Sequence, residues 1–146
     1  MSFRVARRCA GHWRMANAHY SDDVTILSPA ELWRRIPPKH LVQDENLGRL
    51  RPSTAAFEDH PNGSPMSVAL ADVVIGTGRT PLGLLAGLEA YALASITAGL
   101  ARECGQGVSR EPLPNEPAHA VVFGRKTDRT RKRFSLECHW VVPPPE

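Results

Sequence analysis

Apolar residues gather in a few runs of the chain, and polar residues, glycines and prolines separate these runs. The first run, residues 24–27, predicts a short strand because it contains β-branched side chains. Ser28, Pro29 and Glu31 then have the chemistry of a helix start, with a hydroxyl acceptor, a proline at the first helical position and a capping carboxylate. This short capped helix is predicted to end by Ile36, before two prolines.

The longest apolar run predicts a helix over residues 81–103, with Thr80 as its cap and Gly105 after its end. Apolar side chains cover nearly its whole circumference, as in a central core helix. A membrane span is the alternative, but Glu89 near the middle would be costly there, so we expect no membrane association. Small residues recur three and four positions apart on one side. This helix is therefore also the predicted contact with a protein partner or a second copy of the chain.

The C-terminal third predicts a β-hairpin, with strands at residues 119–124 and 134–142 joined by a connection over residues 125–133. Residues 66–75 are apolar enough for a further, buried strand. The predicted fold class is therefore α+β, with a mostly antiparallel sheet that includes the hairpin. This sheet would pack on one long central helix, with the short capped helix nearby.

The hairpin brings candidate catalytic groups together. Pairing Gly124 with Phe134 sets His119 opposite His139, and the alternation of side chains puts Glu137 on the same face. Two imidazoles and a carboxylate can act as an acid–base pair or ligate a transition metal, and the residues leave open which metal, if any, is bound. The alternative is that both histidines make ordinary hydrogen bonds on a half-exposed sheet face.

The connection between these two strands is strongly basic. Cations on a hairpin tip are suited to clamp a phosphate, and two threonines there add hydroxyl donors. No aromatic residue interrupts the run, which argues against stacking on single-stranded nucleic acid. A solvated charge run is the alternative. The predicted ligand-binding residues are Arg125, Lys126, Arg129, Arg131, Lys132 and Arg133.

Charge is unevenly distributed along the 146 residues, whose formal net charge is +3. Residues 1–14 carry four arginines and no acidic residue, and the remaining 14 basic residues face 15 acidic ones. We interpret residues 1–14 as a basic leader or disordered arm, followed by Met15, and residues 15–146 as a single α+β domain. Because the domain alone has a net charge of −1, nucleic acid is not expected as its partner.

The three cysteines, Cys9, Cys104 and Cys138, form no CxxC pair and no even framework of disulfides. This usage is typical of a reducing compartment, and we expect the protein in the cytoplasm. A chain of this length can bury a core without disulfides or metal.

The order of some polar residues suggests a nucleotide ligand. An early arginine, a Ser/Thr pair and a late glutamate resemble the NAD-binding set of ADP-ribosyltransferases. This resemblance covers isolated residues, and it implies an NAD-like ligand. The residues that carry it are Arg34, Arg35, Arg51, Ser53, Thr54 and Glu137.

Two function classes follow. The first is a non-catalytic protein-interaction or accessory module of a bacterial multi-component system, favoured because the chain has no GxSxG nucleophile elbow and residues 76–81 lack the P-loop pattern. The second is an enzyme or binder that acts on a phosphate-containing ligand, a nucleotide or NAD-like molecule, through the histidines and the basic connection. The sequence does not decide whether the protein is an enzyme, and it names no cofactor.

Overall fold

The computed structural model describes residues 20–146, which form a six-stranded sheet, a separate two-stranded hairpin and short helices. The strands are β1 (Glu31–Ile36), β2 (Leu41–Asp44), β3 (Arg49–Pro52), β4 (Met66–Leu70), β5 (Ala92–Thr97), β6 (Gly107–Arg110), β7 (His119–Phe123) and β8 (His139–Val142). The helices are η1 (Pro38–His40), η2 (Thr54–Phe57) and η3 (Leu82–Leu85), all of 3-10 type, and α2 (Ala71–Gly76), α3 (Ala98–Glu103) and α4 (Asp128–Glu137). The predicted leader over residues 1–14 lies outside the described residues.

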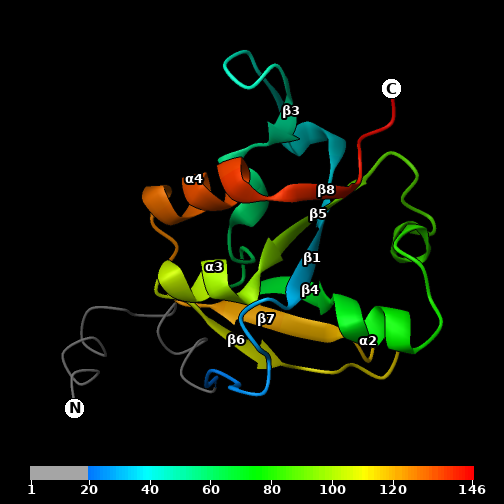
Figure 1. Ribbon diagram of the computed structural model, residues 1–146, viewed down its shortest axis with the longest axis vertical. Helices are drawn as coiled ribbons and strands as arrows, with labels where there is room; N and C mark the ends of the chain where they lie inside the picture. The colour runs from blue at the N-terminus through cyan, green and yellow to red at the C-terminus, as the bar shows by residue number, and fades with distance from the viewer. Residues whose placement is uncertain (1–19) are drawn as a thin grey trace.

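The large sheet has the strand order β6-β7-β4-β1-β5-β8, and all its neighbouring strands are antiparallel. All six residues of β1 pair with β5. By contrast, β1 and β4 pair at two positions, Leu32 with Leu70 and Trp33 with Ala69. Beyond Trp33 the two strands part, and the sheet opens between a half made of β1, β5 and β8 and a half made of β4, β7 and β6 (Figure 1).

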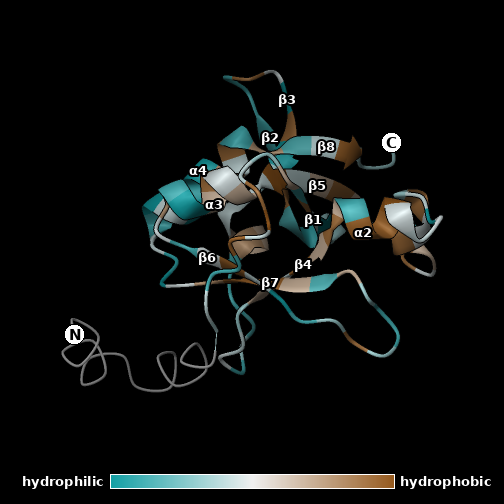
Figure 2. Cartoon of the chain, turned by 60° about the horizontal axis from the view of Figure 1, so that its bottom comes forward, coloured by the Kyte–Doolittle hydropathy of each residue, from teal (hydrophilic) through white to brown (hydrophobic). Residues whose placement is uncertain are grey.

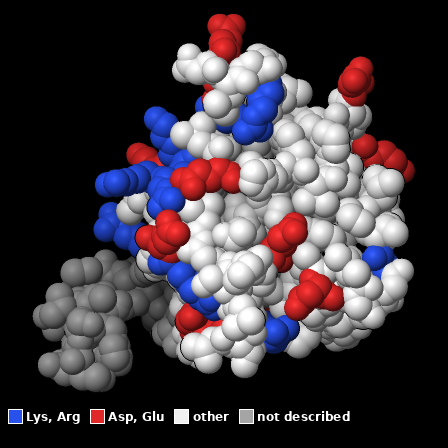
Figure 3. All heavy atoms as spheres, viewed as in Figure 1, with Lys and Arg blue, Asp and Glu red and all other residues white. Residues whose placement is uncertain are grey.

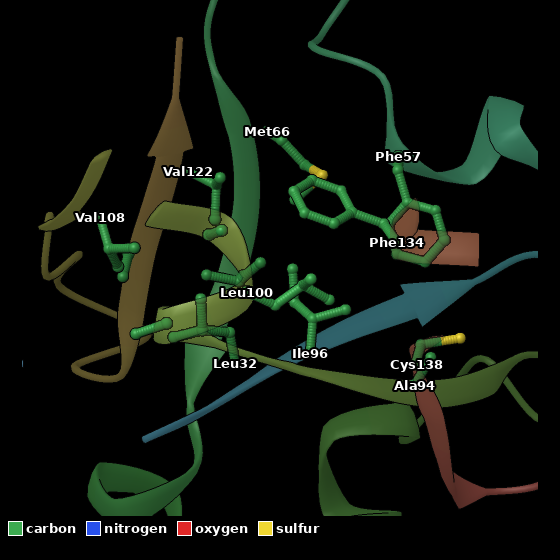
Figure 4. Close-up of a cluster of buried hydrophobic side chains, with 14 of the residues drawn as sticks. Leu32, Phe57, Met66, Ala94, Ile96, Leu100, Val108, Val122, Phe134 and Cys138 are labelled. Carbon is green, nitrogen blue, oxygen red and sulfur yellow. The ribbon is translucent and has the colours of Figure 1, made fainter. Parts of the chain in front are cut away.

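Each face of the sheet buries its own apolar cluster. On one face the side chains of several strands meet those of η2, α3 and α4, and Phe57 packs edge-on against Phe134 with ring centroids 5.7 Å apart. Figure 4 shows this cluster, which includes Leu32, Met66, Ala94, Ile96, Leu100, Val108, Val122 and Cys138. On the other face Trp33 and Leu93 pack with side chains of α2 and η3. The α+β class with a mostly antiparallel sheet is thus confirmed.

The short helix predicted to start at Ser28 is wrong, because residues 31–36 form the central strand β1. Leu32 and Ile36 are four residues apart, a spacing that puts side chains on one side of a helix and equally on one face of a strand. Pairing with β5 and β4 decides between the two.

The long central helix is also wrong. Residues 81–103 form the turn η3, the strand β5 and the helix α3. Gly87 has a φ of 79°, which ends the first piece. Residues 92–96 are buried because β5 is covered on both faces, and such a strand shows no alternation of apolar and polar positions. Its small residues therefore pack inside this chain rather than form a helical surface for a partner.

The predicted C-terminal hairpin does not form. Strand β7 pairs with β4 and β6, whereas β8 pairs with β5, so three strands lie between β7 and β8. Most of the basic connection is the helix α4, which begins where the Thr127 hydroxyl accepts a hydrogen bond from the Thr130 N–H. The outer side of this helix is hydrophilic (Figure 2). The strand predicted over residues 66–75 is correct for its first half and becomes α2 in its second.

Within residues 20–146 we find no helix with the length and hydropathy needed to cross a bilayer.

Candidate functional site

The structure does not bring the three predicted catalytic residues together. His119 is the first residue of β7, and His139 is the first residue of β8 at the far edge of the sheet. Glu137 is the last residue of α4, where it accepts hydrogen bonds from Arg133 at 2.7 and 3.2 Å. The shared sheet face that the acid–base or metal hypothesis required is therefore absent, although His119 has other polar neighbours.

The predicted phosphate clamp is also dispersed. Lys126 is buried, with 3% of its side chain exposed, and its ammonium group donates to Asp59 at 2.6 Å and to the Val122 carbonyl at 2.8 Å. Arg131 pairs with Glu58 and Asp128, and Arg133 pairs with Glu103 and Glu137. Of the six predicted residues, Arg125, Arg129 and Lys132 are exposed and form no ion pair within residues 20–146. Figure 3 shows basic side chains over α4.

The residues that resemble the ADP-ribosyltransferase set divide into separate groups. Arg34 and Arg35 lie on a strand, β1, which is the setting that the resemblance implies. Thr54 is the first residue of η2 and Ser53 precedes it as the N-cap, while Arg51 bonds to Asp44 and Ser135. Glu137 lines a cavity that none of the other members lines.

A different polar cluster lies where β1 and β4 part. The register that pairs Trp33 with Ala69 places Arg35 opposite Ser67 across the opening. His119 pairs with Ala69 on the other side of β4, so Ser67 and His119 are diagonal neighbours on one face. These side chains border a small cavity of about 90 Å³, which we call the cleft. Its lining residues are Trp33, Arg34, Arg35, Ser67, Val68, Ala69, Leu84, Leu93, Glu116 and His119.

The cleft contains a chain of hydrogen bonds. Ser67 Oγ lies 3.1 Å from His119 Nε2, and His119 Nδ1 lies 2.8 Å from the backbone oxygen of Glu111. The Glu111 carboxylate is 3.6 Å from the same Nδ1 atom, and its other oxygen accepts a hydrogen bond from the Tyr20 hydroxyl. Burial and this bond to Glu111 raise the pKa of Tyr20 to about 12, so the phenol remains a donor at neutral pH.

The cleft is electropositive. Arg35 Nε donates to the Leu84 carbonyl at 2.7 Å, and among residues 20–146 this arginine forms no ion pair. Arg34 donates to the carbonyls of Ala56 and Ser67, at 2.9 and 2.8 Å, and thereby fills part of the opening between β1 and β4. Burial lowers the pKa of Arg34 to about 10, against the opposing charge of Asp59, so it stays protonated at neutral pH.

The one acidic side chain that lines the cleft is already neutralised. Arg79 donates to both carboxylate oxygens of Glu116, at 2.8 and 2.7 Å, and these hydrogen bonds lower the pKa of Glu116. Arg35 adds a second positive charge nearby. The cleft therefore offers arginine donors to an anion.

A wider cavity of about 440 Å³ shares two lining residues, Arg34 and Ser67, with the cleft. His40 also borders it, and its buried Nδ1 atom has no hydrogen-bond partner among residues 20–146. Burial lowers the pKa of His40, and the charges of Lys39 and Arg34 act in the same direction. His40 is therefore a neutral imidazole at pH 7.

A cavity of about 570 Å³ lies along β5, β8 and α3, and Glu137 and His139 line it. Its acidic groups are already engaged within the chain. Glu31 accepts hydrogen bonds from Ser95 and Trp33, while Arg133 pairs with Glu137 and a neighbouring glutamate. In the described part of the chain no group of three His, Cys, Asp or Glu side chains is arranged to hold a metal ion.

Sequence reasoning missed most of the cleft. It selected His119 but paired it with residues at the far edge of the sheet. Ser67 is one polar residue in an apolar run, and Glu111 lies in a proline-rich connection, so neither has a local pattern that marks it. The local signal for the cleft is the pair of adjacent arginines Arg34 and Arg35. It would have pointed to the cleft if residues 31–36 had been interpreted as a strand.

Comparisons of the chain with protein-family models, with curated proteins and with solved structures find no match.

Proposed function

We propose that this protein binds a phosphate-containing small molecule, of nucleotide or NAD-like type, in the opening between β1 and β4. The observation that carries the proposal is Arg35, which lines the cleft together with Ser67 and forms no ion pair within the described residues. A guanidinium with free N–H groups is well matched to the oxygens of a phosphate. Arg34 supplies a further positive charge beside it.

The cleft and the wider cavity suit different parts of such a ligand. A space of about 90 Å³ holds a group the size of a phosphate together with some water, since one water occupies about 30 Å³. The neighbouring cavity of about 440 Å³ falls within the range of small-molecule sites, about 300–1,000 Å³. It would take the sugar and base, with His40 in its lining. The resemblance of Arg34 and Arg35 to the early arginine of ADP-ribosyltransferases makes NAD the first nucleotide to test.

The alternative function, a protein-interaction module that uses a helix over residues 81–103, loses its main support. The small residues that were to form its contact surface do not share one helix: Ala94 is in the buried strand β5 and Ala98 in α3, whereas Gly83, Gly87 and Ala90 are in η3 and the turns that follow it. The ligand-binding proposal takes precedence for this reason.

Titration calorimetry with NAD, ADP-ribose and AMP tests the proposal. We expect binding by the wild-type chain and a loss of about 10- to 100-fold in affinity for Arg35→Gln, because a hydrogen bond to a charged group contributes about 1.5–3 kcal/mol. Arg129→Gln is the matched control, since Arg129 is an exposed arginine of α4 away from the cleft. Equal affinities in R35Q and wild type, or a loss confined to R129Q, would remove the cleft as the binding site.

A further inference from the structure

The hydrogen bonds of His119 determine which of its ring nitrogens carries a proton. The Glu111 backbone oxygen, 2.8 Å from Nδ1, can only accept a hydrogen bond, so Nδ1 is the donor. In the neutral imidazole Nε2 is then unprotonated, and the Ser67 hydroxyl, 3.1 Å away, donates to it. The Ser67 hydroxyl therefore points its proton toward the imidazole, and the lone pairs of its Oγ remain free.

The surroundings of this pair favour the transfer of that proton. The Glu111 carboxylate lies 3.6 Å from Nδ1 and would stabilise the imidazolium that forms, while the Tyr20 hydroxyl holds this carboxylate in place. Ser67 is exposed, whereas 15% of the His119 side chain is exposed, so the nucleophile is accessible and the base is shielded. A serine, an imidazole and a carboxylate in this order are the groups of a general-base-activated nucleophile.

We infer that Ser67 is a nucleophile that attacks phosphorus, and that the protein hydrolyses a phosphoester or phosphoanhydride held by Arg35. This inference rests on the proposed function, because it takes the substrate class from the cationic cleft. Arg35, opposite Ser67 across the opening, is positioned to stabilise the negative charge on the phosphoryl oxygens.

The reaction has two steps. In the first, Ser67 Oγ forms a bond to phosphorus, its proton moves to His119 Nε2, and the bond from phosphorus to the leaving oxygen breaks as that oxygen takes the proton. In the second, a water oxygen attacks phosphorus while His119 takes a proton from that water. His119 then gives this proton to Ser67 Oγ as the phosphoserine bond breaks. The sum is hydrolysis of one P–O bond by one water molecule, with no oxidant or metal in the balance.

A small alkyl fluorophosphonate tests the nucleophile directly in the full-length chain. Attack by Ser67 forms an O–P bond and expels fluoride, so intact-protein mass spectrometry should detect one adduct per chain, and peptide mapping should locate it on Ser67. We expect no adduct in Ser67→Ala and labelling at least ten times slower in His119→Gln. Ser64→Ala is the matched control, because Ser64 is also exposed but no imidazole is bonded to its hydroxyl among the described residues.

Glu111→Gln tests the positioning role of the carboxylate. The backbone bond to Nδ1 remains in this variant, so we expect labelling to slow several-fold while the melting temperature is unchanged. Loss of labelling in H119Q without a loss of folded protein by circular dichroism supports the pair as the reactive unit. An adduct that persists in S67A, or no adduct on the folded wild-type chain, would overturn the assignment.

The two proposals fail separately. If nucleotides bind in an Arg35-dependent way but Ser67 does not react, the nucleophile assignment is wrong and the binding function stands. If Ser67 reacts but no nucleotide binds, the reactive serine is supported and the nucleotide as ligand is rejected.

Discussion

A substitution of Lys126 tests whether the basic residues before and within α4 have a structural or a ligand-binding role. Its ammonium group is buried and donates to the Asp59 carboxylate at 2.6 Å and to the Val122 carbonyl at 2.8 Å. Burial lowers the pKa of Lys126, while the hydrogen bond and charge of Asp59 act in the opposite direction. Lys126→Met keeps most of the side-chain length but removes the charge and the donors.

The expected cost is large because both partners stay in place. Removing one member of a buried ion pair costs about 3–5 kcal/mol. The Asp59 carboxylate also accepts a hydrogen bond from the Met66 N–H, which offsets part of this loss, so we expect about 2–3 kcal/mol. For a domain of this size that corresponds to a fall in melting temperature of roughly 8–12 °C.

Urea unfolding followed by circular dichroism measures this change, with Lys132→Met as the control on the exposed side of α4. The control should stay within about 0.5 kcal/mol of wild type. In a double-mutant cycle, Asp59→Asn should cost less in the K126M background than in wild type, because the two side chains interact. A stable K126M protein with weakened nucleotide binding would refute the structural role and revive the phosphate clamp.

Two further predictions concern stability. Hydrogen bonds from Arg79 lower the pKa of Glu116, so the stabilisation from this pair is fully present above the unfolded-state pKa near 4.5 and is lost as pH falls through the lower folded-state pKa. Urea midpoints measured from pH 7 to pH 3 should therefore fall less steeply in Glu116→Gln than in wild type. Identical slopes for the two proteins would contradict this. Gly107→Ala should destabilise the protein by about 1–3 kcal/mol, because the added Cβ would lie 2.3 Å from the Phe123 ring. Gly76→Ala is the control and should leave the stability unchanged, because the space around its Cβ is open. Equal melting temperatures for the two variants would refute the steric argument.

Local patterns located several elements but not all their types. The strand at residues 119–123 and the first half of the one at 66–75 were visible as β-prone apolar runs. The run at residues 92–97 was not, because a strand covered on both faces shows no alternation and matches a buried helix equally well. Leu32 and Ile36 present the same ambiguity, since their spacing of four fits both structures.

The candidate site depended even more on tertiary structure. Arg35, Ser67 and His119 lie on three strands that are adjacent in the sheet but far apart in the chain. Their proximity follows from the strand order and from the early parting of β1 and β4, and no local motif contains either. The predicted pairing of His119 with His139 failed because it assumed that consecutive strands are neighbours, whereas α4 carries the chain to the opposite edge of the sheet.

By itself the sequence determined the α+β class, the antiparallel character of the sheet and the concentration of cations after residue 124. These follow from composition and short-range periodicity, which act within a few residues. Only the tertiary structure decided which apolar runs are strands, which cations are buried and which polar groups share a cleft. The physical reason is that strand pairing and burial are non-local: their free energy depends on partners that the local sequence does not specify.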